Sequence, residues 1–65
     1  MKITKEMYAI ATKSFPLKFI DWNGEPRNDL SNKVLGTKEE CQYNLNTFYE
    51  PEEYQILKVE VTYEF

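Results

Sequence analysis

One thiol is the strongest candidate nucleophile in this sequence. Cys41 is the only cysteine, and the chain has no histidine that could take its proton. The residue also falls on the apolar stripe of the predicted helix, although a position in the first helical turn could lower the pKa of its thiol. We therefore expect Cys41 to be a small buried core residue. A single cysteine excludes an internal disulfide, and without histidine the usual zinc ligand set is missing.

A set of glutamates could serve acid–base chemistry or bind a cation. They flank the one clear helical segment and are Glu39, Glu40, Glu50, Glu52 and Glu53. The D-x-D-x-D-G loop of an EF-hand is absent. A helix start, where negative charge is favourable, and a solvated turn account for all five. The sequence therefore predicts no catalytic residue, no metal site and no cofactor, and we expect a protein that is not an enzyme.

Exposed aromatic side chains are the remaining candidates, and they favour protein binding. Aromatic residues dominate the energetics of many protein interfaces. Trp22 precedes an Asn-Gly turn, and Tyr43 falls on the outer face of the predicted helix. Tyr63 and Phe65 end the last strand. We expect these four to be interaction residues, although Trp22 and Tyr43 also fit incidental surface aromatics or residues covered by a loop.

The last segment, 55–65, is the strand around which the other elements are organised. Its apolar and polar residues alternate with period two, which is typical of a strand with one buried and one solvated face. The apolar face holds Leu57, Val59, Val61, Tyr63 and Phe65. The solvated face holds Lys58, Glu60, Thr62 and Glu64.

Two further strands are predicted near the start of the chain. In 7–12, Tyr, Ile and Thr alternate with Met and Ala, which favours a strand, although Ile3, Met7 and Ile10 also fit a helix over 3–12. Segment 17–22 predicts a second strand, antiparallel to the first.

The connection to the helix is predicted to be mostly irregular. Asn23 and Gly24 predict a turn, because both tolerate positive φ. Pro26 makes a regular two-residue hairpin doubtful, since it cannot donate to a ladder. The polar segment 25–32 predicts a surface loop, and 33–35 predicts a short strand that ends at Gly36.

The helix start is the clearest local signal. In the sequence TKEE at 37–40, the Thr37 hydroxyl can accept from the Glu40 amide while the Glu40 carboxylate accepts from the Thr37 amide, a capping box. Pro51 ends the helix after about three turns. One apolar stripe follows the cap and comprises Cys41, Leu45, Phe48 and Tyr49.

Together these elements predict an α+β fold, a small antiparallel sheet of three to four strands packed against one helix. The order is strand, strand, optionally a short strand, helix, strand. We expect the first and last strands to meet beneath Cys41, Leu45 and Phe48. An eleven-residue strand spans about 36 Å, whereas a domain of this size is roughly 28 Å across. The last strand should therefore overhang its sheet or bend sharply, and an overhang leaves Tyr63 and Phe65 exposed unless a partner covers them.

Length and charge limit the classes of function. The 65 residues form one small domain, 1–65, which needs unusually good packing or self-association for stability. We expect a homo-oligomer, with a dimer favoured. The net charge is −3 and the basic residues are scattered, so direct binding to nucleic acid or to an anionic membrane is disfavoured. No long apolar run or export signal is present, and we expect a cytoplasmic protein.

The chain resembles small accessory proteins of phages and prophages of low-GC bacteria. The resemblance runs from Met7 onward and is carried by a helix start in KVLGTKEEC (33–41) and a terminal strand in EYQILKVEVTY (53–63). These motifs are structural, so no functional residues carry over. The resemblance implies a protein that binds a host factor and redirects or blocks it, antiviral defence enzymes included.

The sequence thus predicts a non-enzymatic, phage-encoded interaction protein that binds and inhibits a host protein. Two alternatives stay open. An oligomer could sequester a nucleotide-like small ligand at its subunit boundaries, although no Gly-rich phosphate loop is present. The protein could also be a structural component of the virion.

Overall fold

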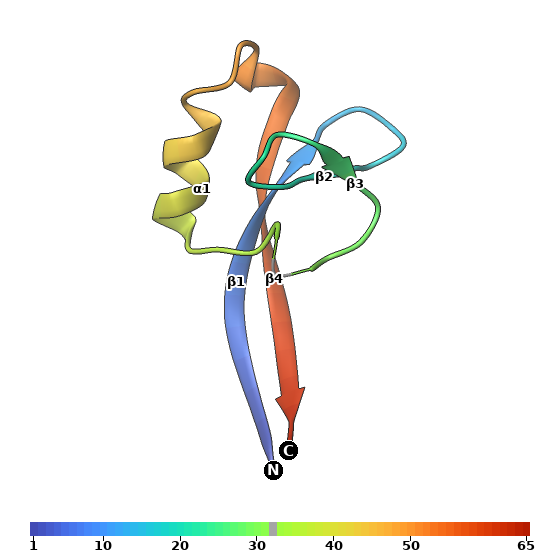
Figure 1. The fold of residues 1–65 in the computed structure, drawn as a ribbon, viewed down its shortest axis with the longest axis vertical. Coiled ribbons are helices and arrows are strands. Elements are labelled where there is room, and N and C mark those ends of the chain that lie inside the picture. Colours follow the sequence, from blue (N-terminus) through green and yellow to red (C-terminus); the bar gives the residue numbers. More distant parts are fainter. Residues whose placement is uncertain (32) are drawn as a thin grey trace.

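The computed structural model describes residues 1–31 and 33–65 and has the predicted α+β fold (Figure 1). An antiparallel sheet with strand order β3-β2-β1-β4 carries one helix, α1, on one face. The elements are β1 (Lys2–Thr12), β2 (Phe19–Ile20), β3 (Pro26–Arg27), α1 (Lys38–Leu45), the 3₁₀ helix η1 (Pro51–Glu53) and β4 (Tyr54–Glu64).

The first and last strands are equally long and set the shape of the molecule. β1 is a strand, so the helix alternative for 3–12 was wrong, and it begins at Lys2 rather than at Met7. Its polar first half forms a strand because β4 pairs with it along its whole length. The molecule measures 42 × 24 × 17 Å, and the two termini lie together at the far end of this pair (Figure 1).

The two middle strands are shorter than the sequence predicts. β2 keeps only two residues of the predicted 17–22 strand. Pro26 and Arg27 form β3 within the predicted 25–32 loop, of which Asn32 is outside the described residues. Pro26 is tolerated there because β3 is at the edge of the sheet, where a missing N–H costs little. The predicted turn is confirmed, and Gly24 takes positive φ (85°).

The predicted strand at 33–35 does not form. Gly36 instead makes an isolated bridge to the middle of β1, in which Tyr8 and Gly36 exchange both backbone hydrogen bonds. Val34 and Leu35 are buried just before this bridge. The segment therefore covers one face of the sheet and does not extend it.

The helix starts as predicted but ends early. Both reciprocal bonds of the Thr37–Glu40 capping box are present. α1 ends at Leu45, about one turn before the predicted end near Tyr49, because short polar side chains compete for its last carbonyls. The carbonyl of Asn44 accepts from both the amide and the hydroxyl of Thr47. As a result Tyr49 is 97% exposed and does not join the apolar stripe.

Two core clusters occupy opposite faces of the sheet. On the helix face, Cys41 is fully buried with Ile10 and Ile20, and Leu45, Phe48, Tyr54 and Ile56 pack around them. On the other face, Ala9 lies under Val34 and Leu35, with Met7, Phe19, Val59 and Val61 around them. The sequence suggested that the helix covers Leu57, Val59 and Val61, but the structure shows that it does not. α1 packs on the other face of β4, so Ile56 and Tyr54 are the β4 residues that the helix covers.

Candidate protein-interaction surface

The pairing of β1 with β4 forms a two-stranded ribbon with an uninterrupted register. Lys2 pairs with Glu64 at one end and Thr12 with Tyr54 at the other, without a bulge between them. Side chains alternate between the two faces of such a ribbon. The half with the termini, 2–6 and 60–64, extends beyond α1 and the short strands (Figure 1).

The two faces of this projecting half differ in chemistry. The face toward the helix side is polar and carries Lys2, Thr4, Glu6, Glu60, Thr62 and Glu64. The opposite face is largely apolar, with Lys5 its one charged residue. We call its apolar members the apolar ribbon face: Met1, Ile3, Val61, Tyr63 and Phe65.

The apolar ribbon face is open to solvent because its cover stops short. Val34 and Leu35 shield Met7, Val59 and part of Val61. Beyond that point Ile3 is 44% exposed, its direct partner Tyr63 is 42% exposed, and Phe65 is 70% exposed. Contiguous exposed apolar side chains at the end of a projecting element are typical of a binding surface.

Polar contacts keep the projecting ribbon paired without a core. The Met1 amino group donates to the carbonyl of Phe65 at 2.7 Å, and the Phe65 amide donates back to Met1 at 2.9 Å. On the polar face, an ion pair joins Lys2 to Glu64 at 3.2 Å, and the hydroxyls of Thr4 and Thr62 lie 3.2 Å apart. The ribbon is thus held by its own cross-strand contacts.

The four predicted interaction residues do not form one surface. Tyr63 and Phe65 lie on the apolar ribbon face and are exposed, as expected. Tyr43 is on α1, beside the opposite half of the ribbon (Figure 1), and is 74% exposed. Trp22 follows β2, and its indole packs on Gly36, where an added Cβ would lie 2.7 Å from Cζ2. Trp22 therefore has a structural contact that the sequence did not indicate.

Sequence reasoning missed Met1, Ile3 and Val61 as members of the same surface. The sequence places Val61 on the buried face of the last strand, and it includes Ile3 only in the helix alternative over 3–12. The period-two spacing of Met1, Ile3 and Met7 was the available signal. Lys5 interrupts that spacing, so the pattern becomes clear only once β4 lies beside it.

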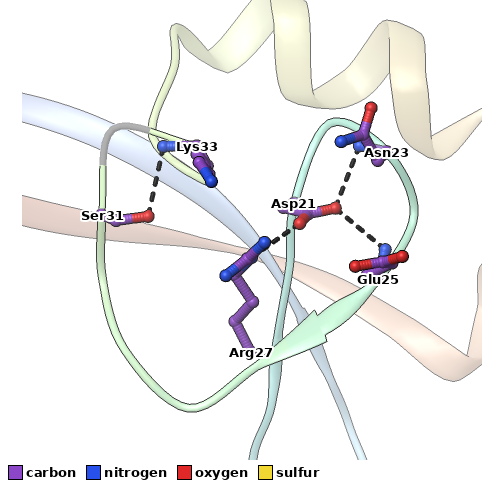
Figure 2. Close-up of polar contacts among 6 residues, drawn as sticks. All are labelled: Asp21, Asn23, Glu25, Arg27, Ser31 and Lys33. Carbon is purple, nitrogen blue, oxygen red and sulfur yellow. Dashed lines mark hydrogen bonds and ion pairs between the residues drawn. The ribbon is translucent and has the colours of Figure 1, made fainter.

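A buried carboxylate organises the β2–β3 turn (Figure 2). Asp21 accepts from the amides of Asn23 at 3.0 Å and Glu25 at 2.9 Å, and from Arg27 Nε at 2.6 Å. Arg27 above all, and then these amides, hold the pKa of Asp21 below its ordinary value. A carboxylate with all these bonds satisfied stabilises a turn and is not poised for acid–base chemistry.

Cys41 and Glu40, two of the candidate catalytic residues, take structural positions. Cys41 is 0% exposed, which confirms the predicted core position, and burial raises the pKa of its thiol. Glu40 serves the helix cap. Within residues 1–31 and 33–65, no three potential metal-ligating side chains come together. No helix in this described part of the chain is long and apolar enough to span a membrane.

One surface pocket lies between the β2–β3 turn and the segment after α1. It has a volume of about 320 Å³ and is lined by Ile20, Gly24, Phe48, Tyr49, Glu50 and Tyr54. Glu50 is the only charged residue in this lining. The lining therefore offers no cation to a phosphate-bearing ligand, and the pocket does not favour a nucleotide-like molecule.

Comparison with protein-family models found no match. Comparisons with curated proteins and with solved structures also found no similar protein. The candidate site is therefore the apolar ribbon face, defined by the geometry of this chain alone.

Proposed function

We propose that this protein is a non-enzymatic interaction protein that binds a host protein through its apolar ribbon face and inhibits it. The observation that carries the proposal is the projecting β1–β4 ribbon, in which Ile3 and Tyr63 pair directly and both stay more than 40% exposed. In a chain of this size, apolar side chains that stay in water contribute little to folding stability, whereas buried ones would stabilise the fold. Binding to a partner would supply that burial.

The chemistry of the ribbon suits a protein partner with an apolar groove or a flat apolar patch. Aromatic anchors such as Tyr63 and Phe65 contribute large contact areas at low entropic cost. The ribbon is narrow and projects from the body, so it can enter a groove that a rounded domain could not reach. Inhibition would follow by occupying a surface that the partner needs for its own activity.

The resemblance to phage accessory proteins supports the class of partner. On this proposal the protein is phage-encoded, acts in the cytoplasm of the host cell and blocks a host factor such as an antiviral defence enzyme. A defence enzyme would be inhibited in proportion to the amount of complex formed.

A pair of neighbouring substitutions tests the proposal. Tyr63→Lys places a charge on the apolar ribbon face, whereas Thr62→Lys places the same charge on the polar face one residue away. The tagged wild-type protein and Thr62→Lys should retain one host protein at stoichiometric amounts, and Tyr63→Lys should lose it. Circular dichroism checks that both variants fold.

Retention of the same host protein by Tyr63→Lys would show that another surface binds it. Failure of the wild-type protein to retain any host protein at stoichiometric amounts would contradict the proposal as a whole. Tyr43→Lys provides a further comparison, because it charges the exposed outer face of α1 and leaves the ribbon unchanged.

A further inference from the structure

The outer edge of β4 offers a second, different kind of binding site. Met1 and Phe65 form a hydrogen-bonded pair, because each donates a backbone hydrogen bond to the other. Along an antiparallel ladder, hydrogen-bonded pairs alternate with non-hydrogen-bonded pairs. The odd residues of β4 therefore bond to β1, and the N–H and C=O groups of its even residues point away from β1. Apart from the Tyr54 amide, which donates to Pro51, these groups have no hydrogen-bond partner in residues 1–31 and 33–65.

This edge lacks most of the features that usually prevent pairing with another strand. Proteins protect edge strands with proline, with bulges or by keeping them short. β4 has eleven residues, no proline and an unbroken register with β1. Its single lysine, Lys58, is accompanied by Glu60 two residues later on the same face. An extended, regular edge of this kind is a template for strand addition.

The charges on the even residues show which strand would fit. Glu60 pairs directly with Glu6 across the ribbon, and like charges directly opposite one another are unfavourable. Lys58 forms an ion pair with Glu6, with Nζ at 3.4 Å from Oε1. Glu6 and Glu60 therefore have only Lys58 as a common positive partner. A second positive charge beside Glu60, at the open edge of β4, would balance the remaining negative charge.

We propose that β4 pairs with β4 of a second copy of this chain, antiparallel, around a two-fold axis at Val59. The open groups belong to even residues, so only registers that pair even residues with even residues can form the hydrogen bonds. With the axis at Val59, Lys58 lies opposite Glu60 of the second copy, and Glu60 lies opposite its Lys58. Ile56 pairs with Thr62 in the same way.

Neighbouring registers are disfavoured either by like charges or by a shorter overlap. An axis at Lys58 places the two copies of that lysine opposite each other, and an axis at Glu60 does the same for the glutamate. An axis at Val61 pairs Lys58 with Glu64 but leaves the first residues of β4 without a partner. The axis at Val59 combines opposite charges with the longest overlap, and on the other face it aligns Leu57 with Val61 of the second copy.

This dimer goes beyond the proposed function and is compatible with it. The two four-stranded sheets would join into one continuous sheet, which removes the exposed edge. The apolar ribbon face of each copy would stay open, since pairing uses the edge of β4 and not the face. Loss of the dimer and loss of host-protein binding therefore have separate causes and separate variants.

Sedimentation and amide exchange test the pairing. We expect a dimer at tens of micromolar, and concentration-dependent protection of the Lys58, Glu60 and Thr62 amides. The amides of Thr4 and Glu6 are the internal control, because they point to the outer edge of β1 and should exchange equally fast at all concentrations. A monomer at these concentrations, or protection on the β1 edge in place of β4, would overturn the proposal.

Charge variants test the register. Glu60→Lys removes the Glu6–Glu60 repulsion within one chain, so it should preserve the fold. It should weaken the dimer at least about tenfold, because each Lys58 then lies opposite a lysine at position 60 of the other copy. Lys58→Glu should weaken it similarly. An equal mixture of the two variants should form a heterodimer with at least wild-type affinity, because both cross-copy pairs are then attractive. Unchanged self-association of Glu60→Lys, or the absence of a heterodimer, would refute the register.

Discussion

The two halves of the β1–β4 ribbon contain the same strands in the same register, yet they differ in which elements cover them. In the covered half, the helix packs on one face of the ribbon, around Ile10 and Ile56, and Val34 with Leu35 pack on the other, around Ala9 and Val59. In the half with the termini, Val61 still packs against Val34 and Leu35, but Ile3 and Tyr63 lie beyond both covers and stay exposed. On the function that we propose, one strand pair is core over part of its length and binding surface over the rest.

The exposure of the apolar side chains of the ribbon is decided by which elements cover them, and not by the sequence pattern of the strands. Val59 and Val61 continue the same alternation as Tyr63, but only the first two reach the cluster beneath Val34 and Leu35. Substitutions in the covered half should change stability, whereas matched substitutions in the projecting half should change binding.

The largest contrast is expected between two isoleucines of β1. Ile10 is buried in the helix-face cluster, so Ile10→Ala should cost about 2–5 kcal/mol and unfold most of the protein at physiological temperature. Ile3→Ala removes the same atoms from a half-exposed position and should cost about 1 kcal/mol or less. Urea unfolding of both variants measures the difference. Equal costs would mean that the projecting half is also buried, for example in an oligomer.

A second prediction concerns the close approach of Trp22 to Gly36. An alanine Cβ at position 36 would lie 2.7 and 2.9 Å from two carbons of the indole, so Gly36→Ala should cost about 1–3 kcal/mol through overpacking. The same substitution in a Trp22→Ala background should cost less, because the ring is gone. A double-mutant cycle by chemical denaturation measures this coupling. An unchanged cost in that background would place the strain at Glu40, whose Oε1 would lie 3.3 Å from the added Cβ.

The Asp21 turn should make the covered half sensitive to acid. The folded pKa of Asp21 lies below its ordinary value of 3.8, with Arg27 the main cause. The stabilisation is complete above the unfolded pKa and is lost as the pH falls through the folded pKa. Asp21→Asn should lower stability at neutral pH and reduce this loss in acid. Urea unfolding between about pH 2 and 6 tests it, and an identical pH dependence in both proteins would contradict it.

The capping box should contribute a smaller amount to the stability of the fold. Thr37→Ala removes the hydroxyl that accepts from the Glu40 amide at 3.1 Å, and it should cost about 1 kcal/mol. Thr37→Ser retains the hydroxyl and serves as the control, with a cost of a few tenths of a kcal/mol at most. Thermal unfolding distinguishes the two. A serine variant as unstable as the alanine variant would show that the threonine methyl group, and not the cap, is important.

The smallest effect is expected on the polar face of the projecting half. Lys2 and Glu64 are mostly exposed and their ion-pair atoms lie 3.2 Å apart. Lys2→Gln should therefore cost about 0–1 kcal/mol, and added salt should abolish the difference from the wild type. A larger, salt-resistant cost in thermal unfolding would mean that this end of the ribbon is buried against another chain.

The sequence determined the local elements where the physical cause is local. The Thr37–Glu40 cap needs only residues three apart, and the period-two alternation from Leu57 to Phe65 requires a strand in any fold. The Asn23–Gly24 turn and the core position of Cys41 follow from the same kind of local pattern. The α+β class could be predicted because these elements leave few ways to bury one helix stripe.

Tertiary structure decided what depends on contacts distant in sequence. The polar 2–6 segment is a strand only because β4 pairs with it, and α1 ends early because Thr47 competes for the carbonyl of Asn44. The sequence identified Tyr63 and Phe65 as exposed, but their neighbours Met1 and Ile3 come from the other end of the chain. No local pattern links residues some sixty positions apart, and only the register of β1 with β4 joins them into one apolar surface.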